Sequence, residues 1–388
     1  MRRCFAKVSA TVRSKIRYLM PSPDVDVAIL GGGCAGLSLA VRLARSDLSV
    51  RVIEPRPAYV DDRAWSFWRT APDPFQDCVR KQWSHWTVKG PQGVARRTSS
   101  HMRYQTVESG AFYQRAQDMI SDGSNTDLSL GVSATEVTRA GDHWLVETDA
   151  GAMTAAAVVD TRPPARVPTY GQFFLGREIR TERPVFDPDV VQLMHFRSAQ
   201  SAGVDFVYIL PFTRTRALVE VTSFAPFNPG RDTYTSWLDA EIAALDAGRI
   251  EILRVEAGAL PMEVGYADPG PDGIIRMGLG GGAARPSTGY AFVRSQIQAD
   301  RVAAALISGQ TPDTRLDGPV TRFMDRVFLQ VLATAPARGP SLFGTLFRNA
   351  SPDRLERFLS GSTHPIDRLS VMASLPPLPF LRAAAFPT

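Results

Sequence analysis

Cysteine and histidine are scarce in this sequence of 388 residues, which contains three cysteines and five histidines. Three cysteines are too few for a disulfide framework, so the composition suits a reducing cytoplasm. Cys4, Cys34 and Cys78 are not spaced as metal ligands, and the scattered histidines form no such pattern either. The sequence therefore predicts a cytoplasmic protein without a bound metal.

Long apolar runs and several catalytic motifs are also missing. No stretch approaches the roughly 20 consecutive apolar residues of a membrane-spanning helix. The sequence has no G-x-S-x-G elbow and no P-loop, so hydrolase and kinase functions have no support. We find no internal repeat and no low-complexity linker.

An excess of positive charge is confined to the N-terminus. The net charge is +5, but six basic residues precede the first acid, Asp24: Arg2, Arg3, Lys7, Arg13, Lys15 and Arg17. Removing these six charges leaves −1 for the rest of the chain. A nucleic-acid partner is not expected, because the body lacks a basic footprint.

Residues 1–22 are interpreted as a basic N-terminal extension. Arg13, Lys15 and Arg17 interrupt any apolar run of the length that a secretory signal needs. Two interpretations stay open, which are a basic amphipathic membrane anchor and untranslated codons before a true start at Met20. The second is favoured because Met20 lies a few residues before the first predicted strand.

A strand–turn–helix–strand unit follows. Asp26–Leu30 and Val50–Glu54 have strand character, and Leu37–Ala44 repeats apolar residues at helical spacing. Between them lies a G-x-G-x-x-G fingerprint made of Gly31, Gly32, Gly33, Cys34, Ala35 and Gly36. In such a unit the glycines allow a tight turn, let the backbone approach a pyrophosphate and let the helix pack closely on the strand. The unit predicts a dinucleotide site at the helix N-terminus.

Glu54, the last residue of the second predicted strand, indicates which dinucleotide the site binds. Glu54 lies 18 residues after Gly36, where it is expected to accept hydrogen bonds from ribose hydroxyls and to disfavour the 2′-phosphate of NADP. A second glycine-rich turn far downstream favours FAD over NAD, because many flavoproteins of this organisation hold the flavin with such an element. The cofactor-binding residues predicted outside the fingerprint and Glu54 are Arg63, Asp160, Gly281, Pro286, Thr288, Gly289 and Tyr290.

Further segments predict an α/β fold with an insertion. Strands are expected at Trp144–Thr148, Ala157–Asp160, Phe206–Leu210, Ala217–Thr222 and Ile274–Gly278, and helices at Thr233–Ala247 and Pro286–Ile307. We expect a Rossmann-type FAD-binding domain (residues 23–75, 131–165 and 270–320) with an inserted mixed β-sheet substrate-binding domain (residues 76–130 and 166–269). A helical C-terminal region (residues 321–388) completes the prediction.

A series of motifs resembles the bacterial lycopene β-cyclases, from about Asp24 to about Arg382. The first is the Trp- and Arg-containing segment Asp62–Trp68 (DRAWSFW) that follows the fingerprint. The others follow in family order: Phe174–Gly176, Arg183–Pro188, Leu193–Met194, Tyr208–Pro211, Arg216–Glu220, Pro286–Tyr290, Phe323–Asp325 and Arg357–Leu359. Together these motifs are specific, although most are not specific alone.

The resemblance implies a redox-neutral cyclisation. A terminal double bond of lycopene, or of another linear carotene, is protonated, a neighbouring double bond attacks the cation, and loss of a proton closes a β-ring. The resemblance implies reduced FAD as cofactor, with NAD(P)H as the external reductant, and a rationale in which the anionic flavin stabilises the cation. The insoluble substrate implies docking on the inner face of the cell membrane, and no obligate protein partner is inferred.

The resemblance also assigns residues. Glu220 lies in a predicted strand with mainly apolar neighbours, where burial would raise the pKa of its carboxyl as a proton donor requires, and it matches the family's acidic position. From pattern alone a surface glutamate would be the commoner interpretation. Trp65, Phe67, Tyr208 and His195 are expected to line the substrate channel, although such aromatic residues are more often plain core.

Two alternatives to a cyclase stay open. One is an FAD-dependent monooxygenase or reductase on a terpenoid or aromatic substrate, which is disfavoured because Leu279 replaces the aspartate of hydroxylases. The other is a degenerate carotenoid-binding homologue. It is motivated by His195 and Arg177, which stand where the family commonly has Asp and Trp. Thr161, where a glycine is usual, is a further departure from the family. The ring type, the number of ends cyclised and the oligomeric state stay open.

Overall fold

The computed structural model describes residues 22–164, 166–197, 200, 202–226, 228–267, 271 and 273–386. All but the last residue of the predicted N-terminal extension lies outside these described residues, so its nature stays a prediction. Within the described part of the chain, no helix is both long and apolar enough to cross a membrane.

The first sheet has seven strands, and its centre is parallel. β8, β2, β1, β11, β10 and β9 lie side by side in this order, and β17 also pairs with β11. Their bounds are β1 Val25–Leu30, β2 Val50–Glu54, β8 Thr126–Leu130, β9 Ala134–Ala140, β10 His143–Thr148, β11 Gly151–Asp160 and β17 Ile275–Arg276. Val27 and Ile29 of β1 enter one hydrophobic cluster, and Ala28 and Leu30 enter another on the opposite face, which explains the apolar run Val27–Leu30.

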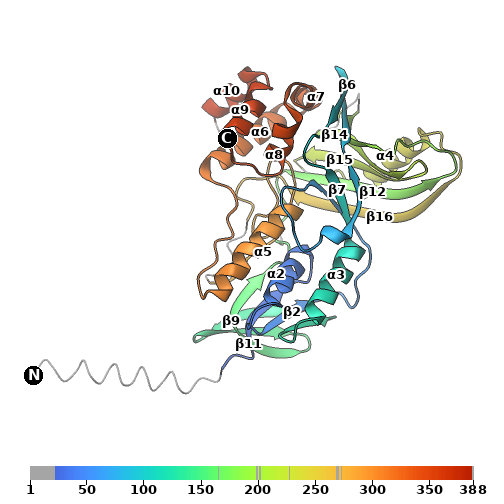
Figure 1. The fold of residues 1–388 in the computed structure, drawn as a ribbon. Coiled ribbons are helices and arrows are strands. Elements are labelled where there is room, and N and C mark those ends of the chain that lie inside the picture. Colours follow the sequence, from blue (N-terminus) through green and yellow to red (C-terminus); the bar gives the residue numbers. More distant parts are fainter. Residues whose placement is uncertain are drawn as a thin grey trace, which may run out of the picture.

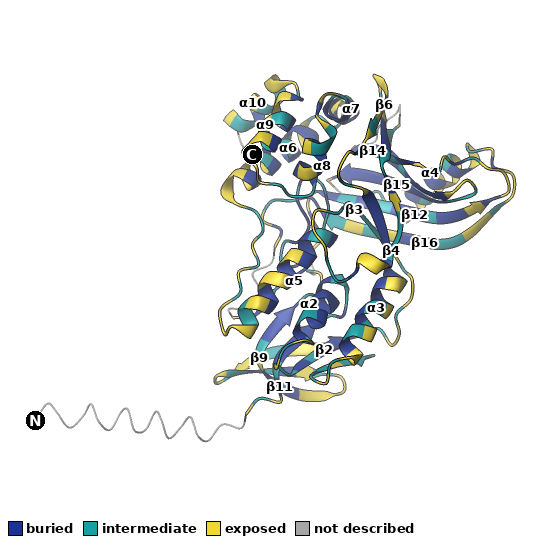
Figure 2. Cartoon of the chain, viewed as in Figure 1, coloured by how far each residue is buried: buried dark blue, intermediate teal, exposed yellow. Residues whose placement is uncertain are grey.

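Three helices cover one face of this sheet: α2 Cys34–Leu43, α3 Ser109–Ser121 and α5 Phe292–Ile307. α2 packs between the other two, and Figure 2 shows it mainly buried, whereas the outer sides of α3 and α5 are exposed. The predicted strands and helix around the glycine fingerprint are confirmed as β1, α2 and β2. This sheet and its three helices form the predicted Rossmann-type domain.

The second sheet is also seven-stranded and lies beside the first domain (Figure 1). Its order is β16, β12, β15, β14, β13, β5 and β6. The strands are β5 His85–Gly90, β6 Gly93–Thr98, β12 Gly171–Thr181, β13 Val190–Phe196, β14 Val204–Thr213, β15 Arg216–Ala225 and β16 Ile250–Pro261. Only β13 and β5 pair in parallel, so the sheet is mixed as predicted, and α4 Arg231–Ala243 packs on its outer face.

A small sheet joins the two larger ones. It contains β3 Ala64–Trp68, β7 Tyr104–Glu108 and β4 Val79–Trp83, with β7 in the centre. A short 3₁₀ turn, Gln76–Cys78, precedes β4. Because β3 follows β2 closely and also contacts α5, this sheet carries the aromatic motif Asp62–Trp68 to the boundary between the domains.

The C-terminal region is helical, as predicted. It contains α6 Pro319–Thr334, a 3₁₀ turn Pro336–Arg338, α7 Gly339–Asn349, α8 Pro352–Leu359, α9 Pro365–Ala373 and α10 Pro377–Ala385. Each helix has proline or glycine at or next to its first residue, which ends the preceding segment and starts the next. These helices cover the inner face of the second sheet and form one hydrophobic cluster with it (Figure 1).

Several predicted boundaries are wrong, including the following three. The helix predicted from Pro286 begins at Phe292, because Arg285–Tyr290 forms a turn in which Gly289 has a positive φ of 72°. The helix predicted to end at Ala247 ends at Ala243, since Asp246 has a positive φ. The strand predicted at Ile274–Gly278 is reduced to β17. In addition, β8 pairs with β2 in the first sheet, although residues 126–130 were grouped with the substrate-binding residues in the predicted division.

Candidate functional site

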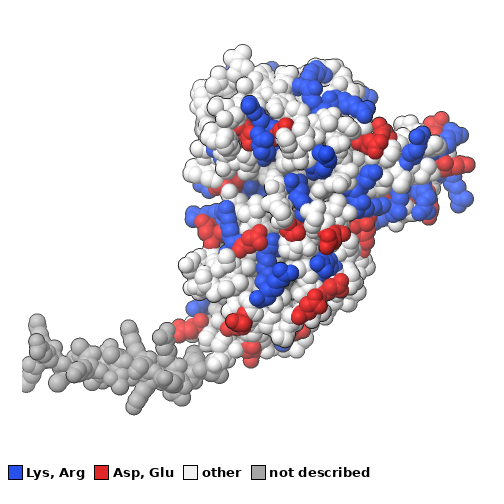
Figure 3. Space-filling model, viewed as in Figure 1, with Lys and Arg blue, Asp and Glu red and all other residues white. Residues whose placement is uncertain are grey.

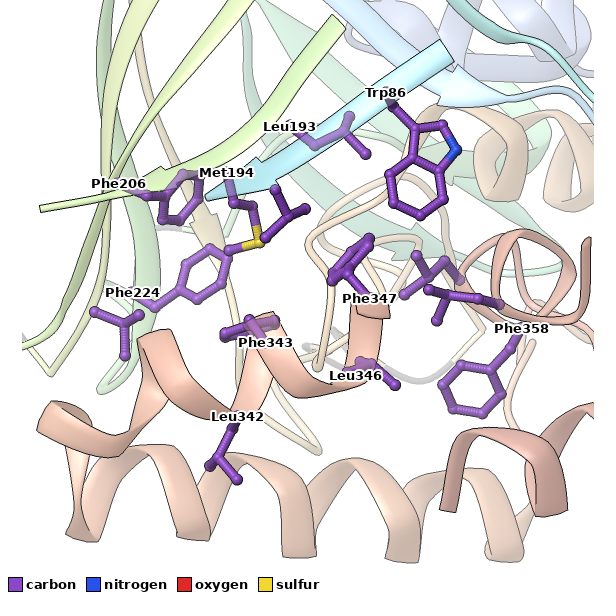
Figure 4. Packing of buried hydrophobic residues seen from close by; sticks show 14 of the residues in the cluster. Trp86, Leu193, Met194, Phe206, Phe224, Leu342, Phe343, Leu346, Phe347 and Phe358 are labelled. Atoms are coloured by element: carbon purple, nitrogen blue, oxygen red, sulfur yellow. The ribbon is translucent and has the colours of Figure 1, made fainter. Parts of the chain in front are cut away.

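One cavity of about 980 Å³ runs from the glycine fingerprint, past the inner face of the second sheet, to the C-terminal helices. This volume is at the top of the range of roughly 300–1,000 Å³ for small-molecule sites. Its walls divide into a polar end at the first domain and an apolar end. The apolar end includes Leu193, Met194, Phe206, Phe224, Phe343, Leu346, Phe347, Leu375 and Phe380. Figure 4 shows side chains from the sheet facing Phe343 and Phe347 of α7.

Backbone geometry explains the glycines at the polar end. Gly31 has a positive φ of 95°, and a Cβ at Gly36 would lie 1.9 Å from the carbonyl oxygen of Gly31. A Cβ at Gly33 would instead meet nothing within 4 Å, so this residue faces open space. The first and third glycines of the fingerprint therefore make the turn and the close packing, while the second leaves room beside the N-terminus of α2 for a bound group.

Glu54 organises the polar end. Its carboxylate accepts hydrogen bonds from the backbone N–H of Gly32 at 2.6 Å and from Arg56 Nε at 2.7 Å. Burial alone would raise the pKa of Glu54, but Arg56 and the Gly32 N–H hold it below its ordinary value. Tyr59 donates to the Gly32 carbonyl oxygen. Glu54 is therefore a charged side chain in a fixed position at the cavity wall.

The turn before α5 forms the wall opposite the fingerprint. Thr288, Gly289 and Tyr290 line the cavity there. The backbone N–H groups of Thr288 and Gly289 donate to the carbonyl oxygen of Arg285, which closes the turn. Gly289 has a positive φ of 72°, which disfavours a side chain at this position, and its Cα faces the side chain of Gln172 on β12.

Glu220 lines the cavity from the middle of β15, Arg216–Ala225. Strand alternation along β15 places Leu218, Glu220 and Phe224 on the cavity face, while Val219 and Val221 pack beneath α4. Thr222 Oγ1 donates a hydrogen bond of 2.8 Å to Glu220 Oε1. Burial, and secondly the negative charge of Glu256, raise the pKa of the Glu220 carboxyl to about 8. Both influences favour the protonated form of this carboxyl.

Neutral hydroxyl groups surround Glu220 on one side. Tyr208 is directly opposite Glu220 in the pairing of β14 with β15, and its hydroxyl lies 2.9 Å from that of Tyr104. Burial raises the pKa of Tyr104, Tyr208 and Tyr290 well above the ordinary value. These phenols therefore stay uncharged, and all three residues line the cavity.

Most, but not all, of the predicted site residues meet in this cavity. Those that line it are Gly31, Gly33, Cys34, Ala35, Glu54, Arg63, Trp65, Tyr208, Glu220, Thr288, Gly289 and Tyr290. Those outside the lining are Gly32, Gly36, Phe67, Asp160, His195, Gly281 and Pro286.

The contacts of Phe67, His195 and Asp160 explain why these three residues lie outside the cavity lining. Phe67 stacks on Phe292 in the hydrophobic core, with ring centroids 4.7 Å apart. His195 Nε2 lies 3.3 Å from Thr87 Oγ1, and burial lowers the pKa of His195 to about 4. Asp160 forms ion pairs with Arg162 and Arg276. Phe67 and His195, which were predicted to line the channel, therefore do not.

Several lining residues were not predicted. Glu256, on β16, lines the cavity beside Glu220, and Tyr104 and Ser66 come from the small sheet. The aromatic residues of α7 complete the apolar end. β16 lacks a clear alternation of apolar and polar residues, so its buried glutamate has no signal in the sequence alone.

The architecture is that of flavin-dependent monooxygenases and reductases. A geranylgeranyl bacteriochlorophyll reductase-like protein from Thermoplasma acidophilum superposes with a TM-score of 0.63 and 14% identity, covering 93% of this chain and 98% of the other. The p-nitrophenol 4-monooxygenase of Pseudomonas putida gives a TM-score of 0.60 at 13% identity, over 90% and 97% of the two chains. The predicted fold class is confirmed.

The sequence defines the family within this fold. The family model described as lycopene cyclase protein matches residues 26–385, so the chain belongs to the lycopene cyclase family. It is 27% identical to the lycopene beta-cyclase of a Paracoccus strain, over 91% of this chain and 95% of the relative. It is 26% identical to the lycopene beta-cyclase of Pantoea ananas, over 93% and 97%. The family resemblance predicted from the motifs is confirmed.

Proposed function

We propose that this protein cyclises the ends of lycopene, or of another linear carotene, to β-rings by acid catalysis. One observation carries the proposal, namely that the buried Glu220 carboxyl and the glycine fingerprint line the same cavity, which has an apolar end. The apolar end suits a linear polyene, and Glu220 is the candidate proton donor in the cavity wall.

In the proposed reaction, the Glu220 hydroxyl gives its proton to a terminal double bond of the carotene. A C–H bond forms, the O–H bond breaks, and a tertiary carbocation results. The neighbouring double bond attacks this cation and forms the new C–C bond of the ring. A ring carbon then loses a proton to the Glu220 carboxylate, which regenerates the acid, so no net oxidation occurs.

The cavity wall supports the cationic intermediate. Trp65, Tyr208 and Tyr290 line the cavity, with Tyr208 directly opposite Glu220 in the sheet, and aromatic faces stabilise cations by about 0.5–2 kcal/mol. The apolar surroundings exclude water, which would otherwise trap the cation as an alcohol. The neutral phenols add no competing negative charge.

We propose FAD as the cofactor. The open space at Gly33, the N-terminus of α2 and the fixed Glu54 carboxylate fit a dinucleotide, and Glu54 retains acceptor capacity for ribose hydroxyls. Thr288 and Gly289 would hold the flavin end. When bound and reduced, with NAD(P)H as the source of electrons, the flavin would supply negative charge that stabilises the substrate cation.

We further propose that the cavity opens to the cytoplasmic face of a membrane between α6, α9 and α10. Phe323, Met372 and Leu381 line the cavity, yet 47%, 57% and 63% of their surfaces are exposed. Ile366, Leu369 and Leu378 add exposed apolar surface nearby, and Figure 3 shows mainly uncharged atoms where α9 and α10 lie. An apolar rim suits entry of a carotene from lipid.

Pigment analysis tests the proposed activity. The chain is expressed in bacteria that accumulate lycopene, and extracted carotenoids are separated by chromatography. We expect conversion to γ- or β-carotene, whereas unchanged lycopene beside well-expressed, flavin-containing protein would refute the activity. With purified protein, far less than one equivalent of NAD(P)H should be oxidised per ring, because a monooxygenase would consume a full equivalent.

A further inference from the structure

Two buried glutamates lie above one glycine in the second sheet. Gly176 of β12 is directly opposite Glu220 of β15 on one side and directly opposite Glu256 of β16 on the other. Residues opposite each other in antiparallel strands point to the same face. Both glutamates line the cavity, and both are at least nine-tenths buried.

Gly176 allows the two side chains to share this space. A Cβ at position 176 would lie 3.3 Å from Glu256 Cγ, 3.4 Å from Glu220 Cβ and 3.1 Å from Leu218 Cδ1. The first and last of these separations are tighter than ordinary van der Waals contact. The absence of a side chain here therefore brings the stems of two carboxyl groups over the same backbone position.

The two carboxyl groups have different partners. Glu256 Oε2 accepts a hydrogen bond of 2.5 Å from Arg254 Nη1, so it has a counter-ion. Arg254 also lies 3.6 Å from Glu178 and 3.5 Å from Asp61. Among the described residues, Glu220 has the Thr222 hydroxyl as its hydrogen-bond donor and forms no ion pair. A single proton shared by the pair is therefore more stable on Glu220.

Among the charged groups around Glu220, Glu256 has the largest effect on its ionisation. The titratable groups that act on Glu220 are Glu256 and Arg254 from β16, Tyr208 from β14, Tyr104 from β7 and Tyr234 from α4. Burial raises the pKa of these three phenols, so they are neutral. Burial also raises the pKa of Glu256, and Arg254 opposes this rise.

We infer that Glu256 is a positioning residue whose Arg254-paired charge, acting across Gly176, keeps the catalytic proton on Glu220 at neutral pH. This inference rests on the proposed role of Glu220 as the acid. Glu256 itself neither gives nor receives the reacting proton. Its carboxylate makes ionisation of Glu220 unfavourable until a developing positive charge on the substrate compensates for it.

Infrared titration of the purified, flavin-loaded protein tests the inference without relying on turnover. Protein labelled with ¹³C-glutamate is titrated from acid to alkaline pH, and the carboxyl band that Glu220→Gln removes is followed in each variant. In Glu256→Gln the midpoint of this band should fall by roughly one pH unit or more, because a neighbouring like charge is lost. Glu256→Asp retains the charge at a greater distance, so its midpoint should lie between those of wild type and Glu256→Gln.

Glu356→Gln is the matched control. Glu356 is a fully buried glutamate that accepts hydrogen bonds from Trp86 and Ser99 and lies outside the cavity lining. Its replacement should leave the Glu220 midpoint unchanged. If Glu256→Gln does not fold, Glu256→Asp still tests the inference. The Glu220 midpoint should then be higher in wild type than in Glu256→Asp, and equal midpoints would overturn the inference.

Turnover gives a second readout. Glu256→Gln should lose roughly tenfold in rate at alkaline pH and little at acid pH, since one pH unit changes the protonated fraction tenfold. An unchanged Glu220 midpoint in Glu256→Gln would overturn the inference even if the wild type cyclises lycopene. A shifted midpoint in a protein that converts no carotene would instead sustain the electrostatic pairing and refute only the proposed function.

Discussion

Two buried glutamates differ in protonation because their partners differ. Glu54, at the end of β2, is 3% exposed, and Glu220, in the middle of β15, is 7% exposed. Burial alone would raise the pKa of Glu54, but Arg56 and the Gly32 N–H hold it below its ordinary value, whereas burial, and secondly the negative charge of Glu256, raise the pKa of Glu220. The same side chain is thus a fixed anion in one region and a proton donor in the other.

The largest effect should come from Glu220→Gln. The amide retains the size and the hydrogen bond to Thr222 but has no transferable acidic proton, so the cyclisation rate should fall by about 10²–10⁴-fold. Carotenoid chromatography after expression in lycopene-accumulating cells measures this loss. Flavin content of the purified variant should equal that of wild type, and full activity would exclude Glu220 as the acid.

Replacement of Glu54 should weaken flavin binding and leave the chemical step largely intact, the reverse of what is expected for Glu220→Gln. Glu54→Ala removes the acceptor for the Gly32 N–H and the partner of Arg56, which should weaken flavin binding by about tenfold or more, equivalent to 1.4 kcal/mol. Flavin fluorescence titration measures the affinity. Activity at saturating flavin should recover substantially, and unaltered affinity would remove Glu54 from the proposed cofactor site.

The two regions should also respond differently to pH. Glu220 acts in its protonated form, so activity should be full at neutral pH and fall as the pH rises through about 8. Glu54 has a lowered pKa, so contacts that need its charge persist at neutral and alkaline pH and are lost only as the pH falls below its ordinary value of 4.5. Rates and flavin affinities measured on the same samples should separate the two profiles. If the rate and the flavin affinity changed at the same pH, the proposed difference between Glu220 and Glu54 would be contradicted.

The smallest effect concerns the cavity mouth. Leu381→Glu should reduce binding to anionic lipid vesicles several-fold, because a charged side chain would have to enter the apolar region of the bilayer. Ile252→Glu is the matched control, since Ile252 is 51% exposed on β16 and does not line the cavity. Vesicle sedimentation measures both variants. Equal binding of the two would place the docking surface elsewhere.

The sequence predicts the polar end of the cavity best, for a physical reason. The β1–α2–β2 unit depends on local interactions, since a tight turn, a close helix and a strand-end acid each require particular residues at short spacing. The strands Phe206–Leu210 and Ala217–Thr222 are predicted for the same reason and are found within β14 and β15, whereas the role of Glu220 comes from the family resemblance. The family is recognisable because its motifs lie on these local elements.

What depends on long-range pairing is not predictable from local patterns. Glu256 approaches Glu220 only because β12 lies between β15 and β16 and contributes a glycine at the shared position. The apolar end depends on how the C-terminal helices pack, and the start of α5 depends on a turn that is closed at Arg285 and has Gly289 at a positive φ. Phe67 and His195 lie off the cavity because tertiary contacts with Phe292 and Thr87 orient them.

Cyclisation in deuterated water tests the central claim most directly. A proton that comes from Glu220 exchanges with solvent and stays on the ring carbon that receives it, so mass spectrometry should find about one deuterium per ring formed. Cyclised product without solvent deuterium would contradict an acid-catalysed mechanism at Glu220.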